Sequence, residues 1–222
     1  MDATAAPGLV NGVYSYAEAA RLLNVTPQRV SRWADGYSFQ RAHDRGMSGP
    51  VLQTERHIGV LSFDELWELM FVRAYVALEV PLPKIRETAE ALARQVGERP
   101  FSTAKLLVHE RRLLWETAGL VLMRPDVGQL VADYAADLAK HVQIRKEHVG
   151  RYDIPEFGRL IYLDRDRRGG EPVVSDRAIP TRIIFGLWER EKDVRAVAGY
   201  YELPEGQVSA AIRYEGQWRL AA

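Results

Sequence analysis

The chain has 222 residues, 47% of them hydrophobic, which is enough to bury an ordinary core in one to three domains. No stretch approaches the roughly 20 consecutive apolar residues that a membrane span needs, and we expect a cytoplasmic protein with no signal peptide and no membrane partner. Cysteine is absent, which excludes disulfides, thiolate zinc sites and cysteine nucleophiles. Thirty basic residues balance thirty acidic ones, so the net charge argues neither for nor against a nucleic-acid partner.

Two short helices are predicted near the start of the chain. Ser15 and Glu18 have the spacing of a capping box, which opens the first helix. Thr26 is a suitable N-cap for the second helix, Pro27 fits its first position, and Gly36 ends it. This arrangement is typical of a helix-turn-helix.

The second helix carries the candidate DNA-binding residues. Val30 and Trp33 lie three residues apart and are expected to face the core. Between Arg21 and Arg56, six arginines stand against three acids, which favours contact with phosphate here. Arginine suits guanine, glutamine suits adenine, and serine suits a base edge or a phosphate. The alternative is a capped helical hairpin with solvated arginines. The outward residues are Gln28, Arg29, Ser31 and Arg32.

A β-hairpin wing is predicted next. The extended segments Tyr37–Arg41 and Val51–Glu55 flank a stretch rich in glycine, serine and proline. Arg41 and Arg45 are expected to reach a flanking phosphate; the alternative is an exposed loop.

Further helices are expected beyond the wing. Ser62 and Glu65 repeat the capping box before a helix that runs towards Pro81, and a partner helix closes at Gly97. Three extended segments are predicted between residues 105 and 124.

Another apolar stripe runs from Asp126 to about His148 and predicts a helix. Such a helix packs in the core, joins two domains, or pairs with a symmetry mate. His141 and His148 would share a face of it, but two histidines without further ligands seldom bind a metal.

The order helix, helix, wing, longer helix over residues 13–97 resembles the MerR-like winged helix-turn-helix family. The likeness is strongest in YAEAARLLNVTPQRV at residues 16–30 and LSFDEL at residues 61–66. The resemblance implies a homodimer that binds an inverted repeat in double-stranded DNA. The cysteines of the metal-sensing members are absent, so we expect no metal and no other cofactor.

The segment RGGEPVVSDRAIPT at residues 168–181 and three predicted short helices after it resemble a small family of domains of unknown function from toxin-antitoxin operons. In place of the usual Gly-Thr-Arg, the chain has Asp176-Arg177-Ala178. A MerR-like domain joined to this unit is similar to the VapB-type antitoxins that accompany VapC toxins, which are PIN-domain ribonucleases. The resemblance suggests that a bulky residue or an arginine plugs the toxin's carboxylate site, with Trp218 and Arg219 as candidates; the alternative is a frayed tail.

The last two helices have the shape of a second helix-turn-helix. Their expected outward residues are mostly acidic, and a negative face repels phosphate, so protein contact or domain packing suits them better. These residues are Glu202, Glu205, Gln207 and Glu215.

No common catalytic motif is present. Asp164 and Asp166 have a spacing that could ligate magnesium, but interleaved arginines favour a solvated turn. A magnesium-dependent hydrolase is therefore the weakest hypothesis.

The sequence thus predicts a mainly α protein with small β-hairpins (α+β). The expected parts are a leader over 1–12, a winged helix-turn-helix over 13–97, a hairpin and connecting helix over 98–150, and a helical unit over 151–222. The leading hypothesis is an antitoxin, not an enzyme, that represses its own operon and neutralises a PIN-domain toxin. The alternative is a MerR-type regulator that senses a ligand through residues 101–148.

Overall fold

The computed structural model describes residues 13–41, 44–52, 59–97, 99–102, 125–146 and 148–219. The chain divides into two compact units: residues 13–140 with 144–149, and residues 141–143 with the chain from 150 onward. Helices dominate both units and the sheets are small, so the predicted α+β class is confirmed. Within the described ranges, no helix has both the length and the apolar character needed to cross a membrane.

The predicted helix-turn-helix is present as α1 (Tyr16–Leu23) and α2 (Pro27–Asp35). The Ser15 hydroxyl accepts from the Glu18 backbone N–H at 3.2 Å, while the Ser15 N–H donates to the Glu18 carboxylate at 2.8 Å. The Thr26 hydroxyl caps α2 by accepting from the Arg29 N–H at 3.3 Å. Each bond satisfies a backbone donor that has no partner within the helix.

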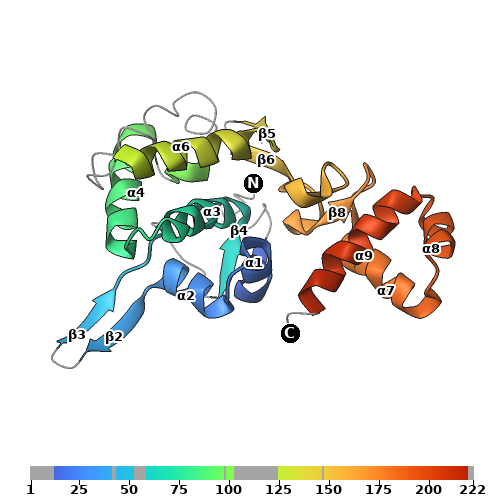
Figure 1. Ribbon diagram of the computed structural model, residues 1–222, viewed down its shortest axis with the longest axis horizontal. Coiled ribbons are helices and arrows are strands. Elements are labelled where there is room, and N and C mark those ends of the chain that lie inside the picture. The colour runs from blue at the N-terminus through green and yellow to red at the C-terminus, as the bar shows by residue number, and fades with distance from the viewer. Residues whose placement is uncertain are drawn as a thin grey trace, which may run out of the picture. The chain divides into compact units, whose positions relative to one another are not determined.

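A longer pair, α3 (Phe63–Ala77) and α4 (Leu82–Val96), follows with the expected bounds. A two-stranded antiparallel sheet of β1 (Val13–Ser15) and β4 (Val60–Ser62) pairs the segments that lead into α1 and α3 (Figure 1). This sheet was not predicted, because three residues are too short a segment to show a period.

Helix α3 forms the centre of the first unit. Phe71 stacks on Phe101 of η1 (Pro100–Ser102), with ring centroids 4.9 Å apart, and meets the edge of Tyr134 at 5.6 Å. Aromatic rings in these geometries bury large apolar areas. They join α3 to η1 and to the later helix α6 (Pro125–Ala139).

The wing is a ribbon of β2 (Tyr37–Arg41) and β3 (Asp44–Ser48). The first strand was predicted, but the prediction of a second strand at Val51–Glu55 is wrong for Val51 and Leu52, and residues 53–55 lie outside the described ranges. In the observed register Phe39 faces Gly46, where a Cβ atom would lie 2.6 Å from the Phe39 ring. The glycine that suggested a turn therefore gives the aromatic ring its place in the ribbon, while Val51 and Leu52 are buried.

The helix predicted to reach His148 ends earlier, at Ala139. The chain then forms β5 (Val142–Arg145) and β6 (His148–Asp153), with Lys146 between them in a left-handed conformation (φ 49°). The apolar residues in this stretch are β-branched and favour strands, although their spacing also fits a helix. His141 and His148 therefore do not share a helix face. The extended segments predicted between 105 and 124 lie outside the described residues.

A sheet follows with strand order β5-β6-β7-β8-β9, where β7 is Ile161–Asp164, β8 is Val173–Val174 and β9 is Ile179–Pro180. These last three strands lie in the second unit. Short 3-10 turns, η3 (Pro155–Phe157) and η4 (Arg168–Gly170), lie between strands.

The described part of the chain after β9 forms the three predicted helices. These are α7 (Thr181–Glu191), α8 (Val194–Tyr201) and α9 (Glu205–Arg219) (Figure 1). The helices pack together through fully buried aliphatic side chains, namely Ile184, Val197, Val208 and Ala211.

Candidate nucleic-acid interface and partner surface

Helix α2 presents a polar stripe whose back is anchored in the core. Val30 and Trp33 are buried, whereas Gln28, Arg29 and Arg32 are exposed. Gln28 and Arg32 are four residues apart, so they lie one above the other on the helix surface. The structure thus brings three of the four predicted α2 residues together on one exposed surface.

Ser31, the fourth residue, lies differently. It is half-buried, and its hydroxyl donates to the Asp35 carboxylate at 3.2 Å. The other carboxylate oxygen of Asp35 accepts from the Tyr16 hydroxyl of α1 at 2.7 Å. The spacing of Ser31 and Asp35 could have suggested the first bond. No local pattern indicates the second, because Tyr16 is 19 residues away.

The base of the wing is fixed to α2. The Arg32 guanidinium lies 5.4 Å from the centre of the Tyr37 ring, at the first residue of β2. Gly36 has a φ of 75°, and a Cβ atom there would lie 2.3 Å from the Ser48 carbonyl oxygen. Such a close approach is possible only for glycine.

Other bonds fix the far strand of the wing and the segment after it. The Arg86 guanidinium of α4 donates to the Ser48 hydroxyl at 2.8 Å. The Val51 N–H donates to the Trp33 carbonyl of α2 at 2.8 Å. The ribbon, which projects beside α2 (Figure 1), is therefore held by both α2 and α4 at its base.

Arg41 and Arg45, the predicted phosphate contacts, lie on opposite strands of the ribbon. Arg41 is in register with Asp44, and Arg45 with Gln40. The side chains of all four residues are outside the described part of the structure. Nearer the base, Met47 is 82% exposed and is in register with the exposed Ser38.

The acidic outer face predicted for the last two helices is only partly present. Glu202 and Glu205 are exposed, but Glu215 is half-buried and accepts from the Thr181 hydroxyl at 2.5 Å. Gln207 is also half-buried and lines a pocket. The prediction that these two residues face outward is wrong, because α9 packs against α7, α8 and β7.

Trp218 and Arg219 lie in the last turn of α9. Their side chains are outside the described part of the structure.

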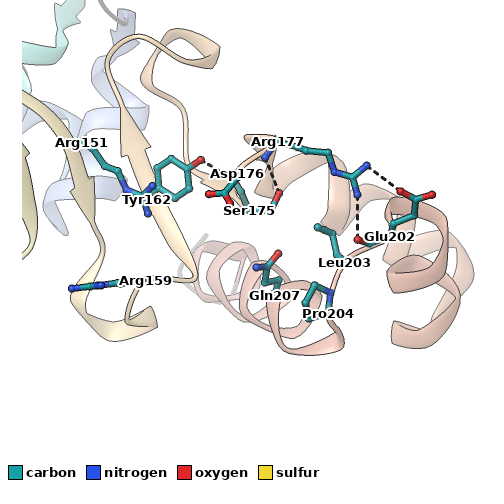
Figure 2. A pocket seen from close by; sticks show the side chains of 10 residues that line it. All are labelled: Arg151, Arg159, Tyr162, Ser175, Asp176, Arg177, Glu202, Leu203, Pro204 and Gln207. Atoms are coloured by element: carbon teal, nitrogen blue, oxygen red, sulfur yellow. Dashed lines mark hydrogen bonds and ion pairs between the residues drawn. The ribbon is translucent and has the colours of Figure 1, made fainter.

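A polar pocket of about 310 Å³ lies in the second unit (Figure 2). The Arg177 guanidinium joins the β8–β9 turn to the α8–α9 turn. It donates to the Glu202 carboxylate at 3.3 Å and to the Glu202 carbonyl at 3.2 Å. The Gln207 side-chain oxygen is buried and has no hydrogen-bond partner among the described residues. The lining residues are Arg151, Arg159, Tyr162, Ser175, Asp176, Arg177, Glu202, Leu203, Pro204 and Gln207.

Tyr162 forms one wall of this pocket. Its hydroxyl donates to the Ser175 carbonyl at 2.7 Å, and the Arg151 guanidinium lies 3.6 Å from its ring centre. Burial raises the pKa of the Tyr162 phenol, and the neighbouring arginines oppose that rise. Sequence patterns did not indicate this pocket, although Asp176 and Arg177, where the chain departs from the family motif, line it.

The two aspartates considered as magnesium ligands organise a turn. Asp164 is 1% exposed, and its carboxylate accepts from the Asp166 backbone N–H at 3.0 Å. The Arg167 guanidinium lies 4.0 Å from the same carboxylate. Across the ranges that the structure describes, no three histidine or acidic side chains are grouped closely enough to hold a metal.

Two family models match parts of the chain. Residues 12–89 match a family described as "Putative DNA-binding HTH domain". Residues 161–214 match one described as "Protein of unknown function (DUF433)".

The chain is similar over most of its length to a protein of Mycobacterium tuberculosis (strain ATCC 25618 / H37Rv) named "Putative antitoxin VapB45", which is 23% identical over 90% of this chain and 92% of that protein. The crystal structure of Rv2018 from Mycobacterium tuberculosis is similar with a TM-score of 0.71 at 20% identity, over 90% of this chain and 96% of that chain. The helix-turn-helix is therefore similar to domains described as putative DNA-binding domains, and the chain has the same fold as Rv2018.

Proposed function

We propose that the protein is the antitoxin of a type II toxin-antitoxin system that represses its own operon. The observation that carries the DNA-binding half is the exposed stripe of Gln28, Arg29 and Arg32 on a capped second helix, with a wing fixed beside it. The similarity to a protein named as an antitoxin, over 90% of this chain, supports the other half.

In this proposal α2 lies in the major groove of the operator. Arg29 and Arg32 offer donor-only guanidinium groups, which suit the O6 and N7 acceptors of guanine, and Gln28 suits adenine. Arg41 and Arg45 of the wing contact the flanking phosphates, which position the protein without specifying the sequence. A homodimer binds an inverted repeat, so that two copies of α2 occupy successive half-sites.

Replacing both Arg29 and Arg32 by alanine tests the DNA-binding half. We expect operator affinity to fall by about 1 to 3 kcal/mol for each bidentate arginine–guanine pairing that the substitutions remove. The protein should stay folded, because both side chains are exposed and the lost contact of Arg32 with the Tyr37 ring costs only about 0.5–1 kcal/mol. Gel shifts on the DNA upstream of the gene measure the effect.

The matched control replaces Arg159 and Arg195, two arginines of the second unit whose side chains are 89% and 84% exposed. This variant removes the same charge and should bind the operator as the natural chain does. Unchanged affinity in the Arg29 and Arg32 variant would exclude the assignment.

The toxin-binding half is proposed for the second unit, without catalysis and without a cofactor. Glu202 and Glu205 are exposed at the α8–α9 turn, and acidic side chains there disfavour phosphate. We propose that the last turn of α9, with Trp218 and Arg219, contacts a PIN-domain ribonuclease, because buried aromatic and arginine side chains concentrate binding energy at interfaces.

A ligand-responsive regulator is the second candidate, and the pocket of the second unit favours it. The region first considered for sensing, residues 101–148, is described only in part, whereas the pocket contains a buried acceptor on Gln207. A metabolite that raises the unfolding temperature of the natural chain but not of a Gln207→Leu variant, and that changes operator affinity, would favour this candidate.

A further inference from the structure

We infer that Ser31 and Asp35 form an edge on α2 that only accepts hydrogen bonds, and that this edge selects an exocyclic amine in the major groove: N4 of cytosine or N6 of adenine. The inference rests on the proposed binding of α2 to DNA and specifies part of the sequence that α2 prefers.

The first step concerns the single proton of the Ser31 hydroxyl. It is donated to the Asp35 carboxylate at 3.2 Å, which leaves only lone pairs on the Ser31 oxygen for other partners. A hydrogen bond to an ionised acceptor is stronger than one between neutral groups, so the Ser31 hydroxyl keeps its O–H directed at the Asp35 carboxylate. Tyr16 keeps the carboxylate in place through its own bond of 2.7 Å.

The second step concerns the position of this edge. Val30 and Trp33 bury the back of α2, and Gln28 and Arg32 lie near the middle of its exposed side. At 3.6 residues per turn, Ser31 and Arg29 fall on opposite flanks of that side. One flank therefore carries a donor-only arginine, and the other carries an acceptor-only serine beside a carboxylate.

The third step is the match to DNA. In the major groove, the donors are the amino groups of cytosine and adenine, whereas guanine O6 and N7 and thymine O4 are acceptors. Phosphate oxygens are acceptors too. Lone pairs on Ser31 and the charge of Asp35 repel all these acceptors, so Ser31 contacts neither phosphate nor the acceptors of guanine and thymine.

The test selects binding sites from a pool of randomised duplex DNA with the full chain. For the natural protein we expect one position of the selected site to be cytosine or adenine, with about tenfold weaker binding for the other two bases. An Asp35→Asn variant still accepts from Tyr16, but its amide donates to the Ser31 oxygen and frees the serine proton. The preference at that position should then shift to guanine or thymine, while the rest of the site is unchanged.

Asp133→Asn is the matched control. Asp133 is an exposed acid of α6 whose carboxylate accepts from the Gln129 side chain, four residues earlier, at 2.8 Å. Asp35 likewise accepts from a residue four positions earlier, Ser31. The same removal of charge at Asp133 should leave the selected site unchanged. Ser31→Ala gives a second measurement and should remove the preference at the one position.

The outcomes separate the two proposals. A natural chain that selects a defined site, together with unchanged profiles for Asp35→Asn and Ser31→Ala, overturns the acceptor edge and leaves DNA binding intact. A natural chain that selects no sequence overturns both. If circular dichroism shows that Asp35→Asn does not fold, Ser31→Ala decides, since it removes one hydroxyl and no charge.

Discussion

Tyr75 of α3 is a fully buried tyrosine whose hydroxyl has no hydrogen-bond partner among the described residues. A buried donor left without a partner costs about 1–3 kcal/mol, because it no longer bonds to water. We therefore expect Tyr75→Phe to raise the free energy of unfolding at pH 7 by about 1 kcal/mol, measured by urea denaturation. Tyr200→Phe, at a site 73% exposed, is the control and should change nothing.

The same hydroxyl gives a pH dependence with a definite sign. Burial raises the pKa of Tyr75 far above its ordinary value of about 10. Below that value the phenol is neutral in both states; above it the unfolded chain loses the proton while the folded chain keeps it, so stability falls as pH rises. The stability gained in Tyr75→Phe should thus grow above pH 10. A variant less stable than the natural chain at every pH would contradict this account.

For single residues, the sequence predicted which side chains are buried or exposed more successfully than it predicted their hydrogen-bond partners. The period of α2 placed Val30 and Trp33 in the core and Gln28 and Arg32 outside, because helix geometry alone decides this. It did not show that Ser31 is bound to Asp35. The i,i+4 spacing allows that bond, but the Tyr16 bond that holds the Asp35 carboxylate in place depends on tertiary structure.

At the scale of elements, Gly36 connects α2 to the wing. A Gly36→Ala variant would combine a positive φ of 75° with a Cβ atom 2.3 Å from the Ser48 carbonyl oxygen, so the wing must move. We expect the free energy of unfolding to fall by about 2 to 4 kcal/mol, from backbone strain and overpacking together. Operator affinity should fall as well, because the wing leaves its place beside α2.

Gly97→Ala separates these two effects. Gly97 also ends a helix, with a φ of 97°, but apart from its chain neighbours no atom of the described residues lies within 4 Å of its would-be Cβ. It should show the strain alone, about 1 kcal/mol, and unchanged operator affinity. Equal reductions of stability in the two variants, measured by thermal unfolding, would mean that contact with Ser48 does not matter.

Helices whose ends are set by capping residues could be predicted from the sequence. Strands whose position depends on pairing with another strand could not. The capping boxes at Ser15 and Ser62 gave the starts of α1 and α3, because each is complete within four residues. The far strand of the wing and the β5–β6 pair depend on partners across a turn. In both places residue spacing alone supported the wrong segment.

At the scale of the whole molecule, the two compact units suggest separable functions. The class of fold and both family matches correspond to patterns in the sequence, since each pattern is confined to one unit. The pocket of the second unit did not appear in any pattern, because Arg151, Arg177 and Gln207 come from segments far apart in the chain.

Separable functions lead to a reciprocal prediction for the full chain. Arg29→Ala with Arg32→Ala should weaken specific operator binding by about 1 to 3 kcal/mol for each bidentate pairing lost and still neutralise the toxin in a growth-rescue assay, because the altered side chains lie in the first unit. Trp218→Ala with Arg219→Ala, in the last turn of α9, should weaken toxin capture and leave operator affinity within twofold of the natural value. An interface anchor of this kind typically contributes about 2 kcal/mol or more, or roughly thirtyfold in affinity. If each variant impaired both activities to the same degree while remaining folded, the two functions would share one surface, and the division of labour proposed for the two units would be wrong.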